Sequence, residues 1–145
     1  MTLNVPTYVG LESGKTLLDG LNVQNAINEN RLRTNQSLTA LGTTQITGFQ
    51  CQGDLSNFTT VAANTVCCLP PANPGRQHII LNNGANTLKI YPYGGVGAAS
   101  VDTTSTIDGG AAGANTTLTT VNRIAIFYCV ASGVWISALL GAVSS

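Results

Sequence analysis

The sequence predicts an all-β fold class: an antiparallel β-sandwich or small barrel preceded by an extended N-terminal arm. From Leu38 onward, short runs rich in β-branched and aromatic residues recur at intervals of roughly ten residues, and turn residues separate them. No amphipathic helical pattern occurs between Leu38 and Leu140. We therefore assign residues 1–38 to the arm and residues 39–145 to the β-sandwich or barrel domain.

The arm differs from the β domain in its charge and lacks an alternating strand pattern of useful length. It holds six of the twelve charged residues of the chain. Asp19 is a suitable N-cap for a short helix that would end at Asn30, although Gly20 and several asparagines lower the helix propensity. Because the arm has too few apolar groups to form its own core, we expect it to be ordered only against its own domain or a partner.

The β domain is divided into short strands by turn residues. The predicted strands are residues 44–50, 58–62, 65–69, 77–82, 87–93, 105–107, 116–121, 123–130 and 134–140. The Pro-rich segment 70–75 breaks both helix and strand, Asn83-Gly84 is a turn dipeptide, and Ser132-Gly133 predicts a hairpin between the last two strands. The Gly- and Ala-rich segments 94–100 and 108–114 are expected to be loops.

The predicted strand 123–130 is apolar on both faces. Alternation places Ile124, Ile126, Tyr128 and Val130 on one face, and Ala125, Phe127 and Cys129 on the other. One face of an antiparallel sheet usually meets water. This strand is therefore expected either to be central in a thick core or to lie at a subunit interface.

Composition excludes several classes of function. Only 8% of residues are charged, six basic residues balance six acidic ones, and 19 Thr and 14 Asn provide uncharged polar surface. The basic residues, spread from Lys15 to Arg123, form no phosphate-binding patch, so we expect no nucleic acid partner. A mean hydropathy of +0.21 predicts a folded chain. Because zero net charge removes repulsion between protein molecules, we expect permanent assembly with a partner.

The four cysteines do not have the spacing of a metal site. Cys51, Cys67, Cys68 and Cys129 show neither a C-x-x-C motif nor a nearby pair of histidines. Cys67 and Cys68 are adjacent, so in a strand they point to opposite faces. We expect the cysteines to be small apolar core residues in a reducing compartment and expect no metal cofactor.

Membrane and export signals are also weak. The uncharged run 124–143 is long enough to cross a bilayer. Its central Ser-Gly turn and its β-branched residues favour a hairpin instead, so we expect no membrane partner. The first twenty residues mix charged and apolar positions and predict no secretory signal peptide.

Two Gly-rich motifs resemble nucleotide-binding loops but lack the required context. The sequence GLESGKT at residues 10–16 has three residues between its first Gly and the Gly-Lys-Thr, where a phosphate-binding loop has four. No strand of useful length precedes it and no convincing helix follows. The sequence GVGAAS at residues 95–100 lacks a βαβ unit and a third glycine. We expect flexible loops and no nucleotide cofactor.

The sequence also contains no convincing arrangement of catalytic residues. His78, the only histidine, lies in a predicted strand, and no G-x-S-x-G motif occurs, so a structural or surface role is expected. Asp102 and Asp108 are close in sequence, as a glycosidase pair would require, but both lie in predicted loops without supporting polar groups. Asp54 and Asp108, which lie before or near glycine, are more simply turn residues. Trp135 and the tyrosines can stack sugars, although packing accounts for them more easily. We predict no catalytic, cofactor-binding or metal-binding residues and no enzyme activity.

An ordered set of segments in the β domain resembles a known group of proteins. The segments are TTVAA (59–63), VCCLPPA (66–72), Gly75, IILNNGANTLKIYP (79–92), TIDG (106–109) and IFYCVASGVW (126–135). Together they resemble a small β domain of tailed-bacteriophage virion proteins, which include head decoration (cement) proteins and some fibre proteins. The N-terminal arm departs from the shared pattern.

The resemblance implies a non-enzymatic virion structural protein with a β-sandwich or barrel. Such a protein forms a homotrimer on the capsid surface, is assembled in the host cytoplasm, and bridges neighbouring major capsid proteins. In proteins of this kind an arm often reaches across a capsid seam. The alternative is a tail-fibre or spike module that binds a host receptor or glycan, using Trp135 and the Gly-rich loops.

Overall fold

The computed structural model of the chain describes residues 33–120 and 124–141. The chain divides into two units, Met1–Leu32 and Arg33–Ser145, and the first of these lies outside the described residues. The expected helix at 19–30 and the GLESGKT motif at 10–16 therefore also lie outside the described part.

The all-β prediction is confirmed, since the described residues form ten strands and no helix. The strands are β1 (Thr34–Thr39), β2 (Phe49–Gln50), β3 (Leu55–Thr60), β4 (Val66–Cys68), β5 (Gln77–Asn82), β6 (Leu88–Tyr91), β7 (Thr106–Ile107), β8 (Thr116–Leu118), β9 (Ile124–Ala131) and β10 (Val134–Leu140). The bounds of β5 and β10 are those predicted. Ser132-Gly133 forms the expected turn between β9 and β10.

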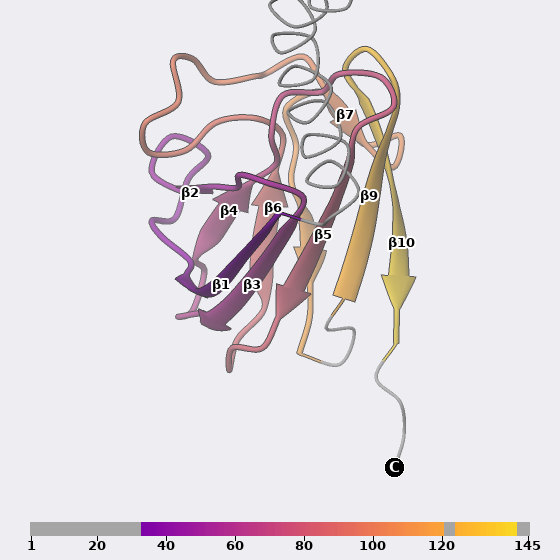
Figure 1. Cartoon of the computed structure of the whole chain (residues 1–145). Helices are drawn as coiled ribbons and strands as arrows, with labels where there is room; N and C mark the ends of the chain where they lie inside the picture. The colour runs from indigo at the N-terminus through magenta and orange to yellow at the C-terminus, as the bar shows by residue number, and fades with distance from the viewer. Residues whose placement is uncertain (1–32, 121–123, 142–145) are drawn as a thin grey trace, which may run out of the picture. The chain divides into compact units, whose positions relative to one another are not determined.

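The strands form two sheets (Figure 1). The six-stranded sheet has the order β1-β3-β5-β9-β10-β7, and the four-stranded sheet has the order β2-β4-β6-β8. From β1 to β8 the chain alternates between the sheets, so odd-numbered strands enter the first and even-numbered strands the second. Only the last connection, from β9 to β10, stays within one sheet.

The expected antiparallel arrangement is wrong for most of the strand pairs. Among the described strands, five of the eight pairings are parallel: β1–β3, β3–β5, β2–β4, β4–β6 and β7–β10. The physical reason is the alternation between sheets. A parallel pair needs a crossover connection, and for β1 to β6 the intervening strand of the other sheet provides it. Only β5–β9, β6–β8 and β9–β10 are antiparallel.

Strand β1 is a second point at which the structure differs from the sequence prediction. Residues 34–38, which the sequence analysis placed in the arm, form most of this strand, and it pairs with β3 at the edge of the six-stranded sheet. Its sequence, TNQSLT, is polar, and most of its residues are exposed. Ser37 has a positive φ of 59°, and the register with β3 shifts on both sides of Leu38. An edge strand of this kind lacks the apolar alternation that identifies a strand in a sequence.

The core draws on both sheets. Its largest buried side chains are Trp135, Phe58 and Phe127 from the six-stranded sheet, and these belong to one cluster with Leu88 and Leu118 of the four-stranded sheet. Phe49 of β2 packs edge-on against Phe58 of β3, with ring centroids 5.4 Å apart. Side chains of the two sheets thus share one apolar interior.

Candidate functional site: an apolar outer face on the six-stranded sheet

The face of the six-stranded sheet that points away from the core is also apolar. Along β5, for example, His78, Ile80 and Asn82 are buried, while Ile79 and Leu81 alternate with them and are half-buried. We define the outer apolar face by the outward side chains of four neighbouring strands. They are Leu55 of β3, Ile79 and Leu81 of β5, Ile124, Ile126, Tyr128 and Val130 of β9, and Val134, Ile136, Ala138 and Leu140 of β10.

Strand register makes this face continuous. The paired residues form three rows across the sheet: Leu55–Ile79–Ile126–Ala138, Leu81–Ile124–Leu140, and Gln77–Tyr128–Ile136. Directly paired side chains on one face of a sheet are in contact range. The outer apolar face is therefore one patch, and Gln77 lies at its border.

The exposed part of the patch is concentrated on the β9–β10 hairpin. Tyr128 is 42% exposed, Ile136 44% and Leu140 47%, and Val130 is exposed beside them. Four of the eight large hydrophobic residues that are exposed in the described part belong to this face: Tyr128, Val130, Ile136 and Leu140. Contiguous apolar patches on a soluble protein mark surfaces that contact another molecule.

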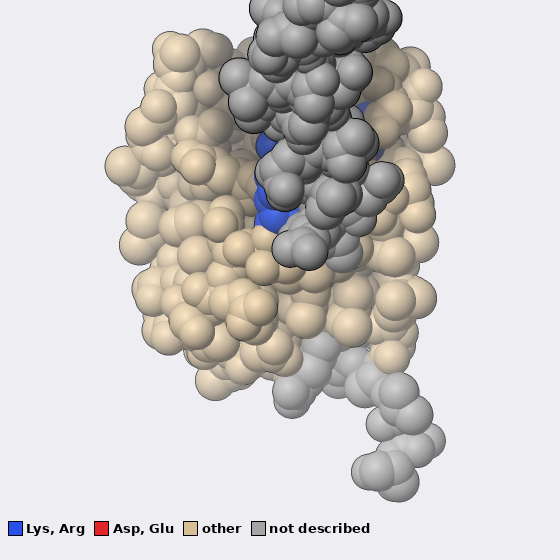
Figure 2. Space-filling model, in the orientation of Figure 1, with Lys and Arg blue, Asp and Glu red and all other residues tan. Residues whose placement is uncertain are grey.

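Charge is absent from the outward positions of these four strands. Their polar members, Asn57, Thr59 and Gln77, are all neutral. Figure 2 shows Lys and Arg in small areas only, and no Asp or Glu, among the described residues visible from this side. The resulting surface is suited to a partner with an uncharged apolar surface.

A second group of chemically capable residues lies buried on the inner face of the same sheet. Ser56 and His78 are fully buried, with 3.1 Å between Ser56 Oγ and His78 Nε2. His78 Nδ1 lies 3.3 Å from the carbonyl oxygen of Gly53. A carbonyl only accepts, so Nδ1 donates to it, while Nε2 lies within hydrogen-bond distance of the Ser56 hydroxyl. The sequence predicts a structural or surface role for His78, and the structure places this side chain in the core.

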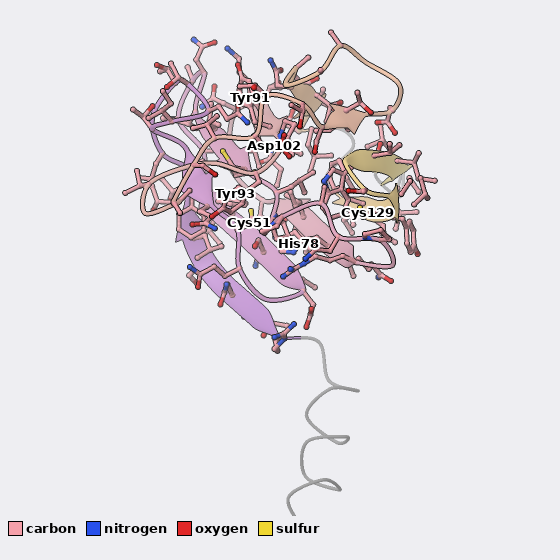
Figure 3. The ribbon with its side chains drawn as sticks, turned by 90° about the horizontal axis from the view of Figure 1, so that it is seen from above. Cys51, His78, Tyr91, Tyr93, Asp102 and Cys129 are labelled. Atoms are coloured by element: carbon pink, nitrogen blue, oxygen red, sulfur yellow. The ribbon has the colours of Figure 1, made fainter. Side chains whose placement is uncertain are left out.

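Cys51 joins this buried group. Burial raises the pKa of the Cys51 thiol, but hydrogen bonds with the side chains of Cys67, His78 and Ser56 outweigh burial and lower the pKa to about 5. The pKa of Cys67 is raised well above its ordinary value, first by burial and then by its interaction with Cys51. All four side chains lie in the domain interior, where Figure 3 shows Cys51 and His78.

A thiol beside an imidazole is the arrangement of a cysteine nucleophile with its base. In this structure Cys51 is 1% exposed and His78 is 0% exposed, so neither meets solvent or a substrate. The sequence contained no signal for this group, because its members lie in separate segments that only the strand pairing brings together. Within the core, the polar atoms of Ser56 and His78 are hydrogen-bonded to each other and to the Gly53 carbonyl.

The two loop carboxylates are held by different partners. Asp102 accepts hydrogen bonds from the backbone N–H groups of Thr104 and Ser105 at 2.8 and 2.9 Å and from both of their hydroxyls. Burial raises the pKa of Asp102, but these hydrogen bonds outweigh burial and lower it. Asp108 accepts from the N–H and the hydroxyl of Ser137 in β10, both at 2.6 Å. The expectation that these two carboxylates lack supporting polar groups is therefore wrong, because Asp102 is held within its own loop and Asp108 joins the turn after β7 to β10.

Trp135 does not have the exposure that sugar stacking requires. Its side chain is 0% exposed, in register with Cys129 of β9 and Ile107 of β7. The indole Nε1 is the one buried side-chain polar atom without a hydrogen-bond partner in the described part. The suggestion that Trp135 contacts a glycan is therefore wrong, because this ring is used for packing.

The remaining motif, GVGAAS at residues 95–100, is a loop, as expected. Its backbone is already engaged, with the Val96 N–H donating to the Gly48 carbonyl at 2.8 Å and the Ala98 N–H donating to the Gly95 carbonyl. Gly95 has a φ of 96°, and a Cβ at this position would lie 2.7 Å from the Gly48 oxygen. Glycine is thus required here by a close backbone approach and not by a phosphate.

Within residues 33–120 and 124–141, no group of three or more His, Cys, Asp or Glu side chains is arranged to hold a metal ion. No helix in this part of the chain is long and apolar enough to span a membrane. Comparisons with protein-family models, with curated proteins and with solved structures found no match for this chain. The outer apolar face is thus the feature of the described structure from which function can best be argued.

Proposed function

We propose that this chain is a non-enzymatic structural protein of a tailed-bacteriophage virion. In this proposal it is a capsid decoration (cement) protein, which binds the outer capsid surface as a homotrimer and stabilises contacts between major capsid proteins. The outer apolar face is the observation that carries the proposal, because a contiguous uncharged apolar surface favours lasting contact with other protein subunits. The ordered segments that resemble virion β domains direct the proposal to a phage particle.

We also propose that the two sheets form a β-sandwich rather than a barrel. Each sheet has two end strands in its pairing order, β1 and β7 in the larger sheet and β2 and β8 in the smaller one. A closed barrel has no such edges. The single core cluster shared by both sheets supports face-to-face packing.

The surface chemistry is consistent with binding to a lattice. A protein with balanced charges and many Thr and Asn side chains forms polar contacts that depend little on salt. Each such contact contributes little, but copies linked through an oligomer bind a repeating capsid surface with a much higher overall avidity. The burial of Cys51 and His78 supports a non-enzymatic role in this proposal.

The decisive experiment compares phage particles assembled with and without this protein. We expect particles that lack it to release DNA at a lower temperature or after milder osmotic shock, and expect added purified protein to restore resistance. Equal resistance in both preparations would contradict a cement role. Copy number separates the alternative: hundreds of copies per particle support capsid decoration, whereas a handful supports a tail-fibre or spike module.

A further inference from the structure

We propose that the outer apolar face is the site where a second copy of this chain packs, with its own outer apolar face as the contact surface. This inference rests on the proposed function and deepens it, because it assigns self-association to a particular surface. A contact between two like faces alone has two-fold symmetry. In the proposed homotrimer the three outer apolar faces are turned toward the three-fold axis, so that each face contacts those of both other copies.

Charge is the first argument for a second copy. Two copies of a charged surface repel each other, whereas the outward positions of β3, β5, β9 and β10 carry no charge. The whole chain has a formal net charge of zero, so long-range repulsion between copies is also small. An uncharged apolar surface is chemically complementary to itself.

The composition of the face resembles the centre of a protein interface. Tyr128 lies within it, paired with Ile136, and tyrosine is enriched where interfaces contribute most binding energy. Asn57 and Gln77, which lie on the same side of the sheet as the apolar rows, are neutral and polar. An apolar centre with a polar rim is the usual organisation of a stable contact between subunits.

The apolar rows alone are smaller than a complete interface between subunits. Four strands at a spacing of about 4.8 Å, over roughly six residues of about 3.3 Å each, span about 300 Å² in plan. A standard interface buries about 800 Å² on each partner. The outer apolar face therefore forms the centre of the contact, with the polar strand ends completing it. A second copy presents an apolar centre of equal size.

The test measures the mass of the full chain in solution by native mass spectrometry and sedimentation. Ile136→Lys places a charge in the middle of the face, and Ile46→Lys makes the same change at a 67% exposed position in the turn before β2. We expect wild type and Ile46→Lys to be oligomers. We expect Ile136→Lys to be monomeric at micromolar concentration, with a dissociation constant raised by about 100-fold or more.

Circular dichroism shows whether Ile136→Lys is folded. If it is not, Ile136→Thr keeps a β-branched side chain in the strand, and we expect it to weaken association by about tenfold. A monomeric wild type, or an oligomer that both folded Ile136 variants leave intact, would overturn the inference. Binding of the variants to capsids that lack this protein separates the two proposals. Unchanged self-association with lost capsid binding overturns this inference and leaves the cement role standing.

Discussion

Both faces of the six-stranded sheet carry apolar side chains, but only the inner face also buries polar ones. The inner face contains three of the four buried polar residues, Ser56, His78 and Asn82, while the outer face exposes aliphatic and tyrosine side chains. Each of the three buried polar side chains has a hydrogen-bond partner within the domain. The inner face can therefore bury polar side chains because they are hydrogen-bonded. The apolar side chains of the outer face are still exposed to solvent in the single chain.

This difference shows that polarity alone does not identify the buried face of a strand. Burial of a polar group is unfavourable only while its hydrogen bonds are unmade. An apolar group makes no such demand, so the outer apolar face can contact a partner without a specific polar match. Hydrogen bonding and shape together determine what packs against the inner face, whereas shape alone determines what packs against the outer face.

The largest expected effect comes from neighbouring aromatic residues on opposite faces of β9. Phe127 is fully buried, and we expect Phe127→Ala to lower the free energy of unfolding by about 3–5 kcal/mol. Tyr128 is 42% exposed, and we expect Tyr128→Ala to lower it by about 1 kcal/mol or less in the monomer. Urea titration, at a protein concentration too low for self-association, measures the free energy of unfolding of both variants. Similar losses would show that the outer face is as tightly packed as the inner one.

A smaller effect is expected for a buried hydrogen-bonding side chain. Asn82 Nδ2 donates to the carbonyl oxygens of Asn86 and Leu118, both at 2.9 Å, and Asn82 Oδ1 accepts from the Gly84 N–H. Asn82→Ala leaves the buried carbonyl group of Leu118 without this donor, and we expect a loss of about 2 kcal/mol in urea titration.

The matched control for this change is Asn83→Ala at the next position. The exposed Asn83 donates from Nδ2 to Asn57 Oδ1 at 2.8 Å, and its removal should cost about 0.5 kcal/mol. Equal losses for the two asparagines would contradict the view that the inner face depends on its internal hydrogen bonds.

The smallest expected effect is on acid stability. Hydrogen bonds from Arg33 lower the pKa of Asp54 below 3.8, and the pKa of Asp102 is also lowered. A carboxyl with a lowered folded-state pKa stabilises the fold above its unfolded-state pKa, and this contribution is lost as pH falls through the folded-state value. Because Arg33 is largely exposed, we expect the carboxyls of Asp54 and Asp102 together to contribute about 1 kcal/mol to the free energy of unfolding.

Urea titrations between pH about 5 and pH about 2 measure this loss. Asp102→Asn should show a weaker dependence on acid than wild type, because one of the two carboxyls no longer titrates. Self-association should change little between pH about 7 and pH about 5, because the outward positions of the four strands carry no carboxylate. An oligomer that dissociates in this range would contradict the assignment of that face.

Some of the fold could be predicted from the sequence because its signals are local. Alternation and turn dipeptides gave the bounds of β5 and β10 and the hairpin turn at Ser132-Gly133. Strand pairing could not be predicted, because β1, β3 and β5 are separated by intervening strands and nothing in their local patterns encodes the neighbour. The polar edge strand β1 was missed for the same reason, since only its pairing identifies it.

The candidate site could be predicted in part. The two apolar faces of β9 indicated either a thick core or an interface, and the structure places one face in the core and exposes part of the other. The contribution of Leu55 and Ile79 to the outer apolar face depends on the parallel register of β3 and β5, which no local pattern reveals. The same register brings Ser56 beside His78 in the core.

The place of β9 in the sheet has a consequence for the synthesis of the chain. Among the described strands it is the ninth to be made, yet it lies between β5 and β10 and pairs with both. A nascent chain or truncated fragment that stops before residue 124 leaves the edge of β5 open and lacks Phe127 and Trp135 from the core. Unpaired strand edges promote pairing between chains, so prematurely terminated products of this protein should aggregate rather than form a smaller domain.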